Sequence, residues 1–482
     1  MKTKTLSAMA LAVGALLALP AGAEDLIAVF REARGYDAAY GAARAALNAG
    51  REKRPQGLAL LLPTVNANAN TAWNEVQNKT TGRDFNFNTH SWQVQLTQPI
   101  FRWQNIVQFQ QSDFQVMQAE AQFANATQDL ILRVSQAYFD VLSAQDNLDF
   151  VRAQKRAIAE QLAQAKRNFE VGTATITDTN EAQARFDLTV AQEIAAINDL
   201  EVRRRALQLV IGRLPDRLAA LRPGVLIEVP GPTAMDSWLQ AAEAQNYNVR
   251  VQEAAWEIAK KEIERQRAGH YPTLDGVITA QNSIGANTQL TGTRNNFDQQ
   301  IYGLQLNLPI YSGGAVLSRT REAASLAEKA RQDLENAKRT ANLDASRSFL
   351  SVTNGLAQVK ALEQALASSE TSLQSNKVGY EVGVRINIDV LNAEQQVTST
   401  RRDLSKARYD TILNGMRLKA AIGALSEEDV ERVNLLLGPE QSLAPEVLPP
   451  IQSPTPPKPL AVQPAPPKPQ AQSNGKPPPA KK

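Results

Sequence analysis

The chain has 482 residues, with 52 Lys or Arg against 49 Asp or Glu, so its formal net charge is only +3. This small basic surplus excludes a nucleic-acid-binding surface, which needs many cations along the phosphates. The sequence contains no cysteine, which excludes disulfides, thiolate metal sites, a cysteine nucleophile and an acylated N-terminal cysteine.

The chain begins with a segment typical of an exported protein. Two lysines precede an apolar stretch from Leu6 to Leu19, and small residues at 21–23 form a cleavage pattern. We therefore predict a signal peptide over residues 1–23, with Glu24 as the first mature residue. The alternative is an uncleaved anchor, which the short apolar run disfavours. The remaining chain has no apolar run of the ~20 residues that a spanning helix needs, so membrane insertion would require β-strands.

One large unit occurs twice along the chain. The segment Asn168–Asp178 (NFEVGTATITD) corresponds to Gly379–Asp389 (GYEVGVRINID). In the same order, Gln95–Phe101 (QLTQPIF) corresponds to Gln305–Tyr311 (QLNLPIY). Both pairs are separated by about 210 residues, which is far too long for a solenoid period. We therefore predict two tandem repeats of one architecture.

Each repeat is expected to contain a helix, two strands and two further helices, in that order. The first repeat, 24–230, has strands about 64–76 and 89–101 and helices about 25–60, 103–168 and 178–212. The second repeat, 231–437, has strands about 273–286 and 299–311 and helices about 234–268, 314–378 and 387–423. A Pro-rich disordered tail is expected over 438–482, because 15 of the 25 prolines lie there and such a segment cannot bury a core.

The expected strands alternate between apolar and neutral polar side chains. Tyr302, Leu304 and Leu306, for example, alternate with Gly303 and Gln305. This alternation, with aromatic residues near the strand ends, is typical of a barrel with lipid outside and water inside; the alternative is a half-buried sheet. Four strands cannot close a barrel, and open edges are not tolerated in lipid, so the chain must oligomerise. Two chains would give a filled eight-stranded barrel, and three would give twelve strands with a lumen.

The expected helices are very long. Residues 103–169 contain neither proline nor glycine, and at ~1.5 Å per residue this helix would extend roughly 100 Å. Its apolar positions recur at spacings of three and four, which indicates coiled-coil packing. If the strands lie in an outer membrane, such helices cross most of a periplasm.

The duplicated order of strands and long helices, with Val-Gly-x-x-x-Ile-x-Asp at each helical break, resembles the TolC family of outer-membrane efflux proteins over about 25–437. The resemblance implies a mixed fold, a membrane β-barrel plus an all-α coiled-coil barrel. Three chains with four strands each would form a twelve-stranded β-barrel that continues into a twelve-helix periplasmic α-barrel. The segments 213–233 and 424–437 lie where the family has a mixed equatorial band.

The resemblance also implies the function. The protein would be the outer-membrane exit duct of tripartite efflux and type I secretion systems, passing drugs or proteins from an inner-membrane pump to the exterior. The implied partners are outer-membrane lipid, a periplasmic adaptor (membrane fusion) protein and an inner-membrane pump of RND, ABC or MFS type.

The family's periplasmic end is closed by polar links between coiled coils. By resemblance, these links correspond to Asp178 and Thr177 meeting Tyr380 and Arg385. An Arg guanidinium holds a carboxylate with two donors, and an exposed pair is worth at most about 1 kcal/mol, so a recruited adaptor and pump could open this latch. The alternative is that these residues are solvated charges at helix ends.

Two further sets of site residues come from the same resemblance. Asp389 matches the first of two aspartate rings at the constriction, whereas Asn392 stands at the second, so we expect weaker cation preference and weaker block by multivalent cations. The turns that match the adaptor-docking tips are Val171-Gly172 and Val382-Gly383, although glycine there would also serve a mere turn.

Two other functions remain as alternatives. A passive outer-membrane porin would explain the strands but not the long helices. A periplasmic coiled-coil adaptor would explain the helices but not four amphipathic strands that end in proline. An enzyme is disfavoured because the sequence has no Gly-rich phosphate loop and no ligand cluster, and we assign no chemistry to His90 or His270; no catalytic residue, metal or cofactor is expected.

Overall fold

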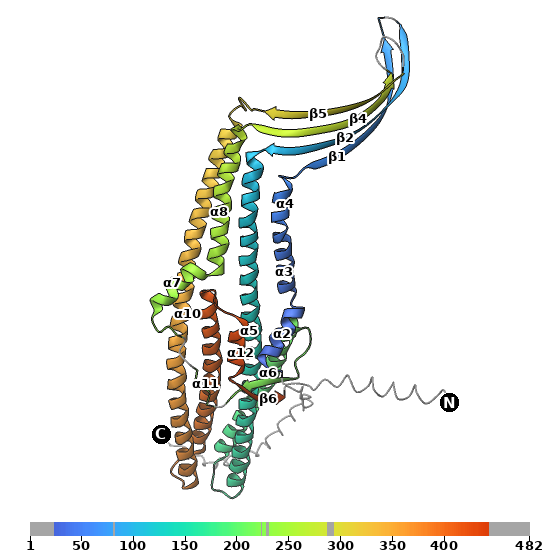
Figure 1. Cartoon of the computed structure of the whole chain (residues 1–482). Coiled ribbons are helices and arrows are strands. Elements are labelled where there is room, and N and C mark those ends of the chain that lie inside the picture. Colours follow the sequence, from blue (N-terminus) through green and yellow to red (C-terminus); the bar gives the residue numbers. More distant parts are fainter. Residues whose placement is uncertain (1–23, 81, 223, 228–230, 287–293, 443–482) are drawn as a thin grey trace, which may run out of the picture. The chain divides into compact units, whose positions relative to one another are not determined.

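The computed structural model describes residues 24–442, apart from residues 81, 223, 228–230 and 287–293 (Figure 1). The expected signal peptide, residues 1–23, and the chain beyond residue 442 lie outside the described residues. No helix within these ranges combines the length and the hydrophobicity that crossing a membrane requires.

The strands are β1 (Thr64–Asn78), β2 (Arg83–Phe101), β3 (Arg217–Leu221), β4 (Thr273–Ala286), β5 (Arg294–Asn307) and β6 (Leu437–Ser442). The helices are α2 (Leu26–Tyr36), α3 (Ala38–Arg51), α4 (Lys53–Ala59), α5 (Trp103–Glu170), α6 (Ile176–Ile211), α7 (Met235–Gln245), α8 (Tyr247–Arg267), the 3₁₀ turn η1 (Ala268–His270), α10 (Ala315–Glu381), α11 (Asn387–Ala421) and α12 (Glu427–Asn434).

Four strands form one antiparallel sheet in the order β1-β2-β4-β5 (Figure 1). The β1–β2 hairpin pairs in unbroken register from Thr64 opposite Thr97 to Asn78 opposite Arg83. Strands β2 and β4 pair next to each other, although more than 170 residues separate Arg102, just after β2, from Asp275 in β4. The sheet therefore joins the two halves of the chain and leaves β1 and β5 as its edges.

Two strands differ from their expected bounds. β2 begins at Arg83 rather than near residue 89, because the hairpin register continues along the whole of β1. β5 runs from Arg294 to Asn307 rather than from about residue 299 to about residue 311. Pro309 lacks the N–H that a ladder needs, so pairing stops before it.

Two regions expected as single helices are broken, and side-chain caps mark the breaks before α3 and α8. Residues 25–60 form α2, α3 and α4, and 234–268 form α7 and α8. The Asp37 carboxylate accepts a hydrogen bond from the Tyr40 N–H, and the Asn246 side chain accepts from the N–H groups of residues 248 and 249. Each cap begins a new helix and turns the chain without proline or glycine.

The long helices pack as pairs. α5 lies against α6 and α8, and α10 lies against α11 and α8. On α10 the buried positions recur at spacings of four and seven residues and are mostly small: Ala323, Ala327, Leu334, Ala341, Ala345, Val352 and Val359. This is the spacing of coiled-coil seams, and alanine allows close approach of the helix axes.

A small second sheet lies beside the largest core cluster. β3 pairs with β6 from Arg217 opposite Ser442 to Leu221 opposite Leu437. Leu218 and Leu437 are buried in the same cluster as Tyr138 and Phe139 of α5. The expectation that the disordered tail begins at 438 is therefore wrong, because residues 438–442 belong to β6, which pairs with β3.

Candidate functional site

The turns at the far ends of the long helices have the same geometry. Residues 171–175 connect α5 to α6, and 382–386 connect α10 to α11. Gly172 and Gly383 both have φ of 78°, a left-handed conformation that strains any side chain. The next N–H donates back to the helix end, from residue 173 to the Asn168 carbonyl at 2.8 Å and from residue 384 to the Gly379 carbonyl at 2.9 Å. The Val-Gly motif is thus a helix stop in both halves.

Apolar side chains are exposed on these turns. Val171 is 72% exposed and Val382 is 68% exposed, and Val384 and Ile386 are exposed beside them. Solvent-facing valine and isoleucine at both tips form an apolar surface on a region that is otherwise polar.

The expected latch residues lie around these turns. Asp178 closes a capping box at the start of α6: its carboxylate accepts from the Thr175 N–H at 2.9 Å and from the Thr175 hydroxyl at 2.8 Å. Thr177 is exposed beside it. Among the described residues, no hydrogen bond or ion pair joins Asp178 or Thr177 to Tyr380 or Arg385 within one chain.

Tyr380 and Arg385 have other partners in the chain. The Tyr380 hydroxyl accepts a hydrogen bond from the Asn168 Nδ2 at 3.2 Å, which links α5 to α10. Arg385 Nη1 lies 3.7 Å from Asp389 Oδ2. A Cβ on Gly379 would come within 2.7 Å of Arg385 Cγ, so the glycine lets the arginine fold back over the end of α10.

The second expected constriction residue has a partner that the sequence did not indicate. Asn392 Oδ1 accepts a hydrogen bond from Arg185 Nη2 at 3.2 Å, and Gln395 Oε1 accepts from Arg185 Nη1 at 3.0 Å. Arg185 belongs to α6, so this contact crosses from one coiled coil to the other. Periodicity places Arg185 on a helix, but it cannot tell which face meets a helix about 200 residues away.

A partly buried polar cluster joins the two coiled coils further from the tip. Tyr409 donates to Asp146 Oδ2 at 2.8 Å, and the Ser405 hydroxyl donates to the same oxygen. Burial raises the pKa of the Asp146 carboxyl, against the effect of the two hydrogen bonds. The cluster fixes α5 to α11, and a carboxylate in mid-helix gave no sequence signal for it.

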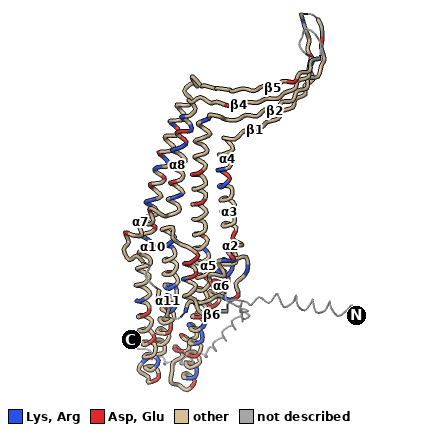
Figure 2. Tube along the Cα trace, in the orientation of Figure 1, with Lys and Arg blue, Asp and Glu red and all other residues tan. Residues whose placement is uncertain are grey.

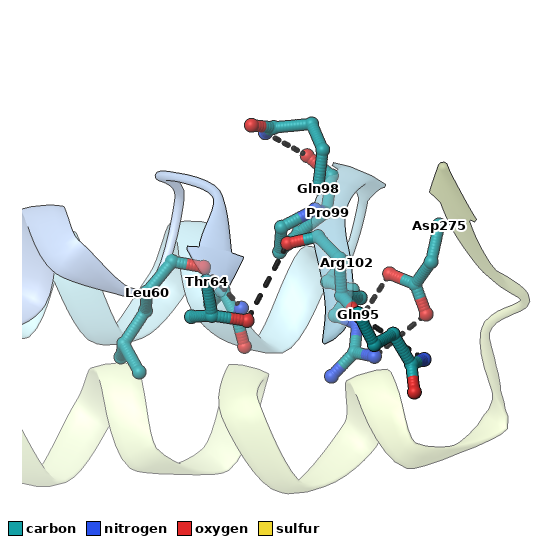
Figure 3. A network of polar contacts seen from close by, with 9 residues as sticks. Leu60, Thr64, Gln95, Gln98, Pro99, Arg102 and Asp275 are labelled. Atoms are coloured by element: carbon teal, nitrogen blue, oxygen red, sulfur yellow. Dashed lines mark hydrogen bonds and ion pairs between the residues drawn. The ribbon is translucent and has the colours of Figure 1, made fainter. Parts of the chain in front are cut away.

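The strand–helix junction is held by a bidentate ion pair (Figure 3). Arg102, the N-cap residue of α5, donates from Nε to Asp275 Oδ1 at 2.7 Å and from Nη2 to Oδ2 at 2.6 Å. Beside it, Gln98 Nε2 donates to the carbonyl oxygens of Leu61 at 3.0 Å and of Pro99 at 2.8 Å. These bonds lie where Pro99, which has no N–H to donate, interrupts the register between β2 and β4.

Charge and polarity are separated within the sheet. Lys, Arg, Asp and Glu lie mostly along the helices, whereas the central parts of the strands contain none (Figure 2). The register aligns one row of amides across all four strands: Asn68, Gln93, Gln281 and Gln299. Three residues further along, and so on the opposite face, it aligns an apolar row: Val65, Leu96, Ile278 and Tyr302. One face of the sheet thus suits water and the other suits lipid.

Comparison with solved structures gives the fold. The Campylobacter jejuni CmeC outer membrane channel has the same fold, with a TM-score of 0.71 at 16% identity, over 86% of this chain and 89% of that one. This chain and that protein therefore share one fold. In the described residues, no group of three or more His, Asp or Glu side chains is arranged to hold a metal ion.

Sequence comparison gives the family. Residues 30–213 and 238–424 match the family model described as outer membrane efflux protein. The chain is 33% identical over 414 residues to the outer membrane protein TolC of Vibrio cholerae, covering 86% of this chain and 93% of that protein. It is also 33% identical over 398 residues to the alkaline protease secretion protein AprF of Pseudomonas aeruginosa, covering 80% and 81%. The chain belongs to the outer membrane efflux protein family, its location is the outer membrane, and the resemblance seen in its sequence is confirmed.

Proposed function

We propose that three copies of this chain form an exit duct that carries drugs or proteins from an inner-membrane pump through the outer membrane. The observation that carries the proposal is the four-stranded sheet, which has one apolar face, one amide-lined face and two unpaired edges, in a chain of the efflux family. Edges β1 and β5 need partners in lipid, because each unpaired backbone group there costs several kcal/mol.

Three copies fit this sheet better than two. A barrel of eight strands fills its interior with side chains, whereas twelve strands leave a lumen that a row of amides would line. The two repeats, 24–230 and 231–437, then supply two strands each, and the helices continue the barrel into the periplasm after export by the signal peptide.

The tips are the proposed contact with the rest of the export system. Val171, Gly172, Val382 and Gly383 form the surface for a periplasmic adaptor, supported by the exposure of both valines. The pump behind the adaptor is of RND, ABC or MFS type. Relatives named for protease secretion and for cation efflux support a duct whose cargo is chosen by the pump.

The tip also forms the proposed gate. Asp178 and Thr177 of one chain would meet Tyr380 and Arg385 of a neighbour or of an adjacent coiled coil, and Asp389 would line the constriction. The support is that the Arg385 side chain is 59% exposed and that its Nη1 lies 3.7 Å from Asp389 Oδ2, which is too long for a hydrogen bond. The guanidinium therefore has N–H donors left for another carboxylate. Recruitment of the adaptor and pump would break these weak links.

Cross-linking tests the trimer directly, because the natural chain has no cysteine. One cysteine is placed in β1 (Asn70→Cys), a second is moved along β5, and a bismaleimide is added to cells. We expect bands of two and three chains and none larger. The control is the same scan in β4, an interior strand, where a partner chain has no access. Bands that end at two chains, or cross-links from β4 that equal those from β5, would refute the proposal.

A further inference from the structure

Arg185 forms a fork between two helices that the proposed opening has to separate. Its two terminal nitrogens donate to Asn392 and Gln395 on α11, at 3.2 and 3.0 Å. These acceptors are three residues apart, so they lie on one face of α11 about one turn from each other. The planar guanidinium matches two acceptors at this spacing, which a lysine could not do.

The fork lies deeper than the latch residues and bridges a loosely packed place. Arg185 follows Asp178 by seven residues, or about 10 Å along α6. Just beyond it, α5, α6 and α11 line a groove whose walls include Gln192, Ala196, Gln395 and Ser399. In the described part of the chain, the two bonds of Arg185 are the side-chain hydrogen bonds that connect α6 to α11.

The charge of Arg185 is not neutralised by its partners. Asn392 and Gln395 are amides, and within the described part of the chain no carboxylate lies within 4 Å of the guanidinium. A guanidinium carries one formal positive charge, so the fork places one positive charge per chain beside Asn392, three residues after Asp389. In a symmetric assembly this charge repeats around the axis.

We propose that Arg185 is both a second closing element and a selectivity-determining residue of the duct; this inference rests on the proposed function. Its bonds to Asn392 and Gln395 hold α6 against α11 in the closed state. Its charge opposes the Asp389 carboxylate and lowers the preference for cations. Closure and selectivity therefore depend on one side chain through two separable properties, its hydrogen bonds and its charge.

The two properties are separated by variants of the full-length protein in planar bilayers containing KCl. Asn392→Ala with Gln395→Ala removes the acceptors and keeps the charge, so we expect conductance to rise about fivefold or more with little change in selectivity. Arg185→Gln removes the charge and keeps an amide donor, so we expect the reversal potential in a KCl gradient to shift toward cation selectivity. The matched control is Arg205→Gln, an exposed arginine of α6 that pairs with Glu201 in its own helix.

The outcomes distinguish this inference from the duct itself. Suppose that wild-type protein forms channels, and that conductance and reversal potential change no more in the Arg185 and Asn392/Gln395 variants than in Arg205→Gln. This result would overturn the inference and leave the duct in place. Wild-type protein that forms no channel would overturn both. Introducing a carboxylate with Asn392→Asp gives a second check, because an ion pair between Asp at this position and Arg185 should lower conductance below the wild-type value.

Discussion

Replacing Arg102 with methionine removes the ion pair that joins β4 to the start of α5. The Asp275 side chain is 8% exposed, whereas that of Arg102 is 40% exposed. The substitution leaves a buried carboxylate without its two donors, and breaking such a pair costs roughly 3–5 kcal/mol when both partners are buried. Because Arg102 is partly solvated, we expect about 2 kcal/mol per chain.

The assay is the midpoint temperature of thermal unfolding in detergent, followed by circular dichroism. Arg54→Met is the matched control, because Arg54 and Asp113 form a single contact at 3.0 Å with 65% and 50% of their side chains exposed. We expect a clear decrease for Arg102→Met and almost none for the control. The double variant Arg102→Met with Asp275→Leu should recover part of the loss, since no unpaired charge remains. Equal midpoints for Arg102→Met and Arg54→Met would refute this account of the junction.

Three further predictions concern the helices. Burial would raise the pKa of Glu262, but hydrogen bonds from Arg265 and two glutamines outweigh burial and lower the pKa to about 2. The ionised carboxylate therefore stabilises the folded protein above pH 4.5, the ordinary pKa, and this stabilisation is lost as pH falls through about 2. Glu262→Gln should therefore flatten the dependence of the thermal midpoint on pH in this acidic window, and an unchanged profile would contradict it. For Asp146 the dependence of folding stability on pH has the opposite sign, because burial raises its pKa and its ionisation at higher pH destabilises the folded protein. Asp146→Asn should therefore stabilise the protein at pH 8 but not at pH 4. Gly383→Ala places a side chain at φ of 78° in open space and should cost about 1 kcal/mol, whereas Gly415→Ala, in open space within α11, should stabilise by a similar amount; equal melting shifts would show that the turn is not strained.

The sequence predicts those parts of the fold that a local period specifies. Alternation with a period of two predicts the strands, and the absence of proline and glycine over 103–169 predicts α5. Breaks made by caps are harder, because Asp37 and Asn246 resemble any polar helix residue until their side chains are seen to accept backbone N–H groups.

Contacts between distant segments could not be read from any local pattern. Arg102 and Asp275 lie 173 residues apart, and Arg185 lies 207 residues from Asn392. The motif and the resemblance drew attention to residues 177, 178, 380 and 385 at the tip, but not to Asn168 or Arg185. Which face of α6 meets α11 depends on the packing of the coiled coils, and a helical period leaves that rotation open.

The central claim is that three chains form a duct whose periplasmic end is closed at rest. Single-channel conductance of the reconstituted full-length protein, wild type beside Arg385→Ser, tests it most directly. The account predicts a small wild-type conductance that rises several-fold in the variant, because the variant removes the guanidinium beside Asp389. A large wild-type conductance that Arg385→Ser does not change would mean a permanently open pore and would contradict the account.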